Sequence, residues 1–167
     1  VEETTPEVVE SLDSPAVTTA STVESGVGVT SDPCPEAIGG IPTGADQSKG
    51  CIYLGMLNDY TGPYAAAGPA LETAQRAFWL WANSPEAAGG AGGVGDYSVA
   101  IIEGTDTGYN PQKHLEAYNA QKGDVAALAM SLGTVQTLFI LDELDKDNMV
   151  AAPMSWYSGW SYKSVDK

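Results

Sequence analysis

The chain has 167 residues, of which 22 are acidic and seven are basic, so its formal net charge is −15. A charge this negative repels phosphate backbones and anionic lipid headgroups, which argues against a nucleic-acid partner and against docking on a membrane surface. The 43% of hydrophobic residues suffices for the core of one domain with a tail, but no apolar run approaches the roughly 18 residues of a membrane-spanning helix.

The first fifty residues differ in composition from the rest of the chain. They hold nine acidic residues and one basic residue, and they contain no aromatic residue and no methionine. Thr, Ser, Pro, Val and Glu dominate residues 1–30, and such a segment cannot bury enough apolar surface to offset the entropy lost on ordering. We therefore expect residues 1–33 to be a disordered acidic tether, acting either as a spacer for the folded part or as an inert solubilising tail.

The two cysteines, Cys34 and Cys51, flank a turn-rich segment. Neither has the spacing of a metal ligand, and the presence of a single histidine argues against a zinc site. In an oxidising compartment the pair would close the loop at residues 34–51 and contribute about 3 kcal/mol to stability. We expect this disulfide; two unrelated reduced thiols are the alternative.

Residues 51–167 hold every Trp, Tyr, Phe and Met of the chain and form the predicted folded unit. The short apolar run at residues 52–57 is typical of a strand buried on both faces. Residues 65–83 are predicted to be a helix, because apolar residues recur there at helical spacing. The residues expected to face the core are Leu71, Ala74, Phe78 and Trp81.

A second strand is predicted at residues 97–103, after a glycine-rich turn at residues 89–95. Asn110 suits the N-cap of a helix and Pro111 suits its first turn. These signals predict a second helix over residues 111–121. Two of its residues are expected to face inward, namely Leu115 and Tyr118.

The last predicted elements are a strand at residues 124–130, a helix at residues 135–142 and a strand at residues 148–153. The pattern β-α-β-α-β-α-β is typical of an α/β fold, with a parallel sheet and helices on both faces. Ligands of such sheets bind beyond the carboxyl ends of the strands. Function is therefore expected in four edge loops, which are residues 58–64, 104–110, 131–134 and 153–160.

The edge loops lack the motifs of common nucleotide-binding and hydrolytic sites. No G-x-G-x-x-G or phosphate-binding glycine loop opens a helix after a strand, and no G-x-S-x-G nucleophile elbow occurs. The single histidine, His114, is expected on the surface, and the acidic cluster at residues 142–147 is expected to be a solvated face. Asp59 and Asp106 are interpreted as turn formers rather than as a catalytic pair. The sequence thus predicts no enzyme activity, no cofactor and no metal site.

Hydroxyl groups and aromatic rings dominate the edge loops instead. They include Tyr60, Thr61, Tyr64, Tyr109, Ser131, Thr134, Ser155, Trp156, Tyr157, Ser158 and Trp160. A site of this kind orients a small solute through a few hydrogen bonds and encloses it with rings. The alternative is that Trp156 and Trp160 are ordinary packing residues.

Four segments, taken in order and spacing, carry a family resemblance. They are the first strand with Thr61-Gly-Pro-Tyr-Ala-Ala-Ala-Gly68, then Asp106-Thr-Gly-Tyr-Asn-Pro111, Ala127-Leu-Ala-Met-Ser-Leu-Gly-Thr134 and Met149-Val-Ala-Ala-Pro-Met-Ser155. Together they resemble solute-binding proteins of ABC importers, of the branched-chain amino acid (Leu/Ile/Val) type. The resemblance implies a lobe of the type I periplasmic-binding fold at residues 51–167.

The resemblance also implies a place and partners for the whole protein. Members of this family are periplasmic or extracellular, often lipoproteins, and close two lobes over a small-molecule solute before delivering it to an ABC permease. The N-terminal residues would then be a membrane tether below a lipid anchor upstream. Because the folded part is short for two lobes, we expect a partial N-terminal lobe with weak affinity of its own.

The predicted ligand-binding residues are Tyr64, Ser131, Gly133, Thr134, Met154, Ser155 and Trp156. Trp156 stands where amino-acid binders of the family have a Thr that holds the ligand's polar groups, and Ala67 stands where some members have a ring. An amide, a urea-like compound or an aromatic solute is therefore as good a candidate as Leu, Ile or Val.

Three other classes of function stay open at this point. The same fold serves as the ligand-sensing domain of receptors and regulators. A flavodoxin-like or Rossmann-like enzyme would share the alternation of strands and helices, although no fingerprint supports it. A self-contained adhesion or structural module would share the tether and would bind no solute.

Overall fold

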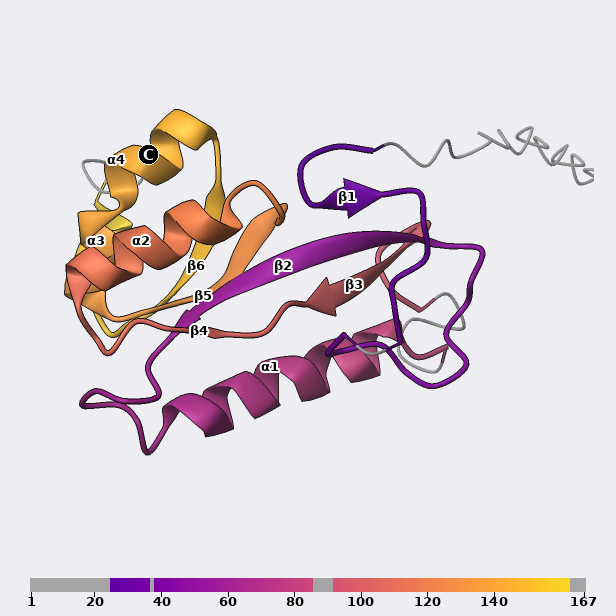
Figure 1. Cartoon of the computed structure of the whole chain (residues 1–167), viewed down its shortest axis with the longest axis horizontal. Coiled ribbons are helices and arrows are strands. Elements are labelled where there is room, and N and C mark those ends of the chain that lie inside the picture. The colour runs from indigo at the N-terminus through magenta and orange to yellow at the C-terminus, as the bar shows by residue number, and fades with distance from the viewer. Residues whose placement is uncertain (1–24, 37, 86–91, 163–167) are drawn as a thin grey trace, which may run out of the picture.

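The computed structural model describes residues 25–36, 38–85 and 92–162, which form one α/β unit around a six-stranded sheet (Figure 1). The strands are β1 (Val29–Thr30), β2 (Gly50–Asn58), β3 (Tyr97–Ile101), β4 (Thr105–Asp106), β5 (Ala127–Leu132) and β6 (Val150–Met154). The helices are α1 (Gly68–Asn83), α2 (Pro111–Gln121), α3 (Thr134–Phe139), α4 (Leu141–Asp147) and the short 3-10 turn η1 (Ser158–Ser161).

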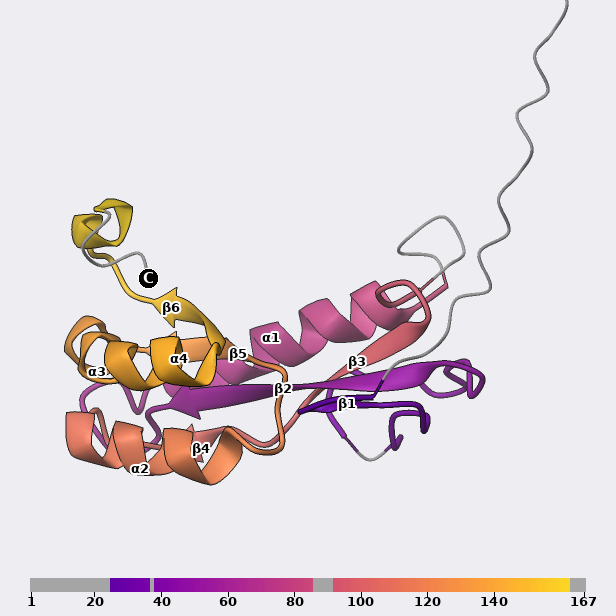
Figure 2. The same ribbon diagram turned by 90° about the horizontal axis from the view of Figure 1, so that it is seen from above.

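The long strand β2 is the centre of the sheet. On one side it pairs in parallel with β3 and then with β4. On the other side it pairs with antiparallel β1 and then with parallel β5, and β5 pairs in turn with parallel β6. Helix α1 lies on one side of the sheet and α2 on the other (Figure 2). The predicted α/β class, with a parallel sheet and helices on both faces, is confirmed.

Most element boundaries differ from the prediction by one to three residues; for example, α1 begins at Gly68 and β3 ends at Ile101. Three further differences concern β5, the third helix and the loop at residues 104–110. Strand β5 begins at Ala127 rather than at residue 124, because residues 122–124 form a turn in which the N–H of Asp124 donates to the carbonyl of Gln121. The predicted third helix is two short helices, α3 and α4, which break at Ile140. The acidic cluster therefore lies within α4 instead of following the helix. Within the predicted loop at residues 104–110, β4 adds two residues to the sheet.

The prediction of the inward face of α1 was right for Leu71 and wrong for the other three residues. Phe78 and Trp81 are 51% and 58% exposed, and Ala74 is also exposed. The inner face is polar instead, because Glu72 and Arg76 form an ion pair there and Arg76 reaches the carbonyl oxygens at the end of β3. Apolar contact comes from two half-buried residues of the helix, Leu71 and Trp79.

Helix α2 follows the prediction closely. The Asn110 side chain caps it by accepting from the backbone N–H of Lys113 at 3.0 Å, and Pro111 is its first residue. Tyr118 is fully buried and Leu115 packs against the core, as expected. This core cluster joins α2 to β5 and α4, while a smaller one around Met56 and Met130 lies under α1.

The N-terminal part of the described chain is more ordered than expected. Residues 1–24 of the predicted tether lie outside the described residues, as do residue 37, residues 86–91 of the glycine-rich turn and residues 163–167. Within the expected tether, however, β1 pairs with β2, and Gly28 fits directly over the backbone of Ala126. The tether prediction therefore fails for residues 25–33. The Cys34–Cys51 disulfide is present and buried, which confirms that expectation.

Two findings bear on partners of the described part of the chain. None of its helices has the length and apolar character needed to cross a membrane. No group of three His, Cys, Asp or Glu residues in the same part could hold a metal ion.

Candidate functional site

A small cavity of about 260 Å³ lies where the carboxyl ends of the parallel strands meet. The register places the ends of β5 and β6 side by side there, with Leu132 opposite Met154. Its lining residues are Tyr64, Tyr109, Leu132, Gly133, Thr134, Met154, Ser155 and Trp156. All four predicted edge loops therefore contribute to one cavity.

Six of the seven predicted ligand-binding residues line this cavity: Tyr64, Gly133, Thr134, Met154, Ser155 and Trp156. Ser131 does not. Two lining residues were absent from the predicted set. Tyr109 was recognised as an edge-loop aromatic residue, but nothing in the sequence showed that it faces Tyr64. Leu132 lies within the predicted edge loop at residues 131–134 but was not among the predicted ligand-binding residues, and in the structure it is the last residue of β5.

The wall formed by two tyrosines is the most structured part of the cavity. The rings of Tyr64 and Tyr109 lie 4.8 Å apart between centroids, tilted by 41°. Tyr109 has a left-handed backbone, with φ of 56°, which few non-glycine residues adopt. Its pKa is raised, first by burial and then by the hydrogen bond with Tyr64. The Tyr109 phenol is therefore a neutral hydrogen-bonding group at neutral pH.

The loop that carries Tyr64 is held by a buried carboxylate. Asp59 is fully buried and accepts hydrogen bonds from the backbone N–H groups of Gly62 at 2.6 Å and Tyr64 at 2.8 Å. The preceding residue, Asn58, donates to the carbonyl of Gly68 at the start of α1. The prediction that Asp59 is a turn former agrees with these contacts, which use both carboxylate oxygens for the backbone.

A second carboxylate joins the loop that carries Tyr64 to the loop that carries Tyr109, the two tyrosine loops. Asp106 accepts from the N–H of Tyr60 at 2.9 Å, from the hydroxyl of Thr61 at 2.7 Å and from the N–H of Gly108 at 3.0 Å. The Thr61 hydroxyl is the main reason why the pKa of Asp106 lies below its ordinary value. Gly62 lies so close to the other loop that a Cβ would approach the Gly108 carbonyl to 2.6 Å. The two loops form one braced unit.

Ser131 has a different place from the one predicted. It is fully buried, and its hydroxyl lies 2.8 Å from Nε2 of His114 and 2.8 Å from the hydroxyl of Thr137. His114 is also fully buried, so its expected surface position was wrong. Burial lowers the pKa of His114 to about 4. Ser131 thus faces protein groups and is not a direct contact for a solute in this cavity.

The opposite wall comes from the end of β6 and the segment after it. Trp156 is 88% exposed, so its ring stands at the mouth of the cavity. Ser155 accepts a hydrogen bond from the indole N–H of Trp160 at 2.7 Å, which keeps Trp160 out of the lining. The N–H of Gly133 donates to the carbonyl of Met154 at 3.2 Å and joins the two walls. Of these two tryptophans, only Trp156 lines this cavity.

The chemistry of the lining favours binding over reaction. None of the eight lining residues carries a charged side chain. The nearest hydroxyl–imidazole pair, Ser131 with His114, is buried behind the lining and bonded to protein. Asp59 and Asp106 are occupied by backbone and hydroxyl donors. The walls therefore offer hydroxyls, rings and a thioether to a solute, and no activated nucleophile.

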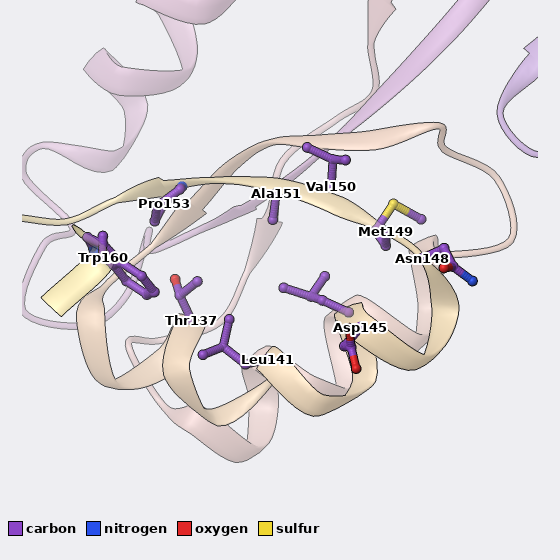
Figure 3. A pocket seen from close by; sticks show the side chains of 10 residues that line it. Thr137, Leu141, Asp145, Asn148, Met149, Val150, Ala151, Pro153 and Trp160 are labelled. Carbon is purple, nitrogen blue, oxygen red and sulfur yellow. The ribbon is translucent and has the colours of Figure 1, made fainter. Parts of the chain in front are cut away.

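A larger cavity of about 500 Å³ lies along β6, on the side of α3 and α4 (Figure 3). Its lining is mostly apolar and includes Leu141, Leu144, Met149 and Pro153, with Trp160 at one end. None of the predicted ligand-binding residues lines it. It runs along β6, which is an edge strand of the sheet and whose Val150 is 73% exposed.

Two solved structures are similar to this chain. One is a fatty acid ABC transporter substrate-binding protein from Thermomonospora curvata, with a TM-score of 0.55 and 26% identity, over 77% of this chain and 28% of its own. The other is an ABC transporter substrate-binding protein from Aeropyrum pernix, with a TM-score of 0.51 and 24% identity, over 63% of this chain and 27% of its own. The second likeness concerns the fold alone.

The chain spans little more than a quarter of the length of each of these structures. No family model matches it, and no curated protein matches it. The comparisons support the broad class of substrate-binding proteins and do not support a preference for Leu, Ile or Val. Proteins of this class bind a solute without converting it, which agrees with the expectation that the chain is not an enzyme.

Proposed function

We propose that the chain is part of the first lobe of a solute-binding protein that serves an ABC importer. The observation that carries this proposal is the small cavity at the carboxyl edge of the sheet, where six of the seven predicted ligand-binding residues meet. The similarity to two ABC transporter substrate-binding proteins supports it. The solute would bind against Tyr64, Tyr109, Thr134 and Trp156, and a second lobe would close over it.

The uncharged lining favours a small organic solute with an apolar or aromatic part and one hydrogen-bonding group. An amide or a similar compound has these features. An amino acid and a fatty acid, the solute named for one of the similar structures, have the apolar part and in addition carry charged groups. A net charge on the solute would have to be met by backbone groups or by the second lobe, since none of the eight lining side chains is charged.

The proposed lobe would continue past β6. Among the described residues no strand pairs with the outer edge of β6, and the larger cavity lies beside it. The similar structures are more than three times as long as the matched part. One lobe encloses a solute only partly, so the affinity of the chain by itself is expected to be weak.

The proposed location is periplasmic or extracellular, with the N-terminal residues as a membrane tether below a lipid anchor upstream. The buried Cys34–Cys51 disulfide supports an oxidising compartment. The importer permease would be the protein partner of the complete molecule.

The test is a solute titration of the ¹⁵N-labelled chain followed by NMR. Leucine, octanoate and benzamide serve as the three probes. Binding of any one of them should shift the amide resonances of Gly133 and Thr134 and the indole resonance of Trp156. Trp156→Ala should weaken the affinity for that probe, measured from the shifts of Gly133 and Thr134, at least tenfold. Trp81→Ala is the matched control, because Trp81 is also exposed but lies on α1.

A result in which none of the three probes moves these resonances would count against solute binding at this cavity. Shifts confined to Met149, Ala151 and Leu141 would assign binding to the larger cavity instead.

A further inference from the structure

A chain of three buried polar side chains runs behind the small cavity. His114 comes from α2, Ser131 from the end of β5 and Thr137 from α3, and each is at most 2% exposed. Nε2 of His114 lies 2.8 Å from Oγ of Ser131, which lies 2.8 Å from Oγ1 of Thr137. Oγ1 of Thr137 lies 2.8 Å from the carbonyl oxygen of Gly133, a lining residue.

The direction of these hydrogen bonds follows from the number of protons available. A carbonyl oxygen can only accept, so the hydroxyl proton of Thr137 is directed at Gly133, or at the Ser131 carbonyl 3.2 Å away. Oγ1 of Thr137 must then accept from the Ser131 hydroxyl. That hydroxyl has only one proton, so its oxygen accepts from Nε2–H of His114. The hydrogen bonds therefore point from His114 through Ser131 and Thr137 to Gly133.

The state of the other ring nitrogen agrees with this direction. Nδ1 of His114 is buried and has no hydrogen-bond partner among the described residues. A buried acceptor nitrogen without a donor costs less free energy than a buried N–H without an acceptor, because buried acceptors are more often left unsatisfied than buried N–H groups. Burial favours neutral His114 and is the cause of its low pKa.

Gly133 is the residue on which these contacts converge. Its carbonyl accepts from both the N–H and the hydroxyl of Thr137, at 3.0 and 2.8 Å. Its φ of 107° is a left-handed conformation that suits glycine. A Cβ there would lie 2.2 Å from the Gln136 amide oxygen and 2.7 Å from the Tyr109 ring. The position of Gly133 thus sets the distance between the tyrosine wall and the β6 wall.

We propose that His114, in its Nε2–H tautomer, and the hydroxyls of Ser131 and Thr137 are positioning residues that hold the Gly133 wall of the solute cavity. The three residues touch no solute. They act through Gly133, whose peptide groups bond to Thr137 on one side and to Met154 of β6 on the other. The inference rests on the proposed function only in taking this cavity as the solute site.

The first test is the tautomer of His114 in the full chain of 167 residues. Because the chain has a single histidine, long-range ¹H–¹⁵N NMR spectra report on this ring without assignment. The expected result at pH 7 is a protonated Nε2 and an unprotonated Nδ1. Ser131→Ala should convert the ring to a mixture of tautomers. A ring protonated at Nδ1 in the unchanged chain would overturn the proposal.

The second test asks whether the hydroxyl of Thr137 positions Gly133. Thr137→Val keeps the shape of the side chain and removes its hydroxyl, so the amide resonances of Gly133, Thr134 and Tyr109 should move. Thr137→Ser keeps the hydroxyl and should restore them. Thr73→Val is the matched control, since the Thr73 hydroxyl bonds to the carbonyl of Pro69 in the same manner on α1.

Unchanged resonances of Gly133 in Thr137→Val would overturn the positioning role. If Thr137→Val does not fold, His114→Gln and His114→Leu decide instead, because Gln keeps a donor near the place of Nε2 and Leu has none. Neither test uses a solute, so a failure here is distinguishable from a failure of the proposed function. If a probe binds, Thr137→Val should weaken its binding about tenfold, and Thr137→Ser should weaken it less than threefold.

Discussion

The two cavities of this molecule differ in how their walls are held. The small cavity is lined by loop residues whose positions are fixed by hydrogen bonds, with Asp59, Asp106 and Thr137 each bonded to the backbone of a wall. The larger cavity has about twice the volume, and its lining is mostly apolar side chains of α4 and β6; Thr137 also lines it, and bonds to a wall of the small cavity. The difference teaches that fixed polar geometry, more than size, marks the candidate site.

The largest expected effect on stability belongs to the larger cavity. Leu144 lines it, yet this side chain is only 6% exposed and packs in the main core cluster. Leu144→Ala should lower the free energy of unfolding by about 2–5 kcal/mol, because it leaves a hole among buried side chains. Urea denaturation would measure the change. Leu80→Ala, at an exposed position of α1, is the control and should change stability by less than about 0.5 kcal/mol.

Leu144→Ala should leave solute binding at the small cavity intact under conditions where the variant is folded. Loss of the Gly133 and Thr134 shifts in the folded variant would show that the two cavities are not separate in function.

Acid should destabilise the fold through the residues behind the small cavity. The pKa of His114 is about 4 in the folded protein, below its ordinary value of 6.5. The unfolded chain therefore binds the proton more readily between these values, and stability is full above about pH 6.5 and falls as the pH approaches 4. The loss should reach about 3 kcal/mol. Denaturation curves between pH 7 and 4.5 in the chain and in His114→Gln would measure it, and equal slopes in the two would contradict it.

A smaller change is expected from the bond between the two tyrosine loops. Asp106→Asn keeps one acceptor oxygen in place of two, so it cannot accept from Tyr60, Thr61 and Gly108 at once. Stability should fall by about 1 kcal/mol, and the amide resonances of Tyr64 and Tyr109 should broaden or move. Asp46→Asn makes the same exchange at a carboxylate that accepts from Ser48, away from the cavity, and should leave both tyrosine resonances in place.

The smallest effect on stability should come from the residue that matters most for the solute. Trp156 is 88% exposed, so Trp156→Ala should change the free energy of unfolding by less than about 0.5 kcal/mol. Its effect should be confined to solute titrations. A large loss of stability would mean that Trp156 packs against the rest of the protein in solution and would remove it from the proposed site.

The sequence allowed the fold class and most of the cavity lining to be predicted for identifiable reasons. Apolar runs and the Asn110–Pro111 cap are local signals, and they located the strands and α2. The rule that ligands bind at the carboxyl ends of parallel strands then selected the right loops. Tyr64, Thr134 and Trp156 meet in the structure because those loops share one edge of the sheet.

The errors concern contacts between elements far apart in the sequence. His114 looked like a surface residue because its partner, Ser131, belongs to a neighbouring strand and has no local signature. The same contact takes Ser131 out of the lining. On α1 the apolar stripe pointed outward, because Glu72 and Arg76 bond to backbone groups at the end of β3 and Tyr60. Periodicity assigns an apolar stripe to the core and cannot foresee a polar inner face.

The N-terminal arrangement has a mechanical consequence for a protein held by its N-terminal end. A pull from that end first loads the short β1–β2 pairing, where Val29 and Thr30 face Ile52 and Cys51. Once β1 detaches, the load passes to the covalent bond between Cys34 and Cys51 at the start of β2. Unravelling stops there, at the end of the sheet opposite the cavity.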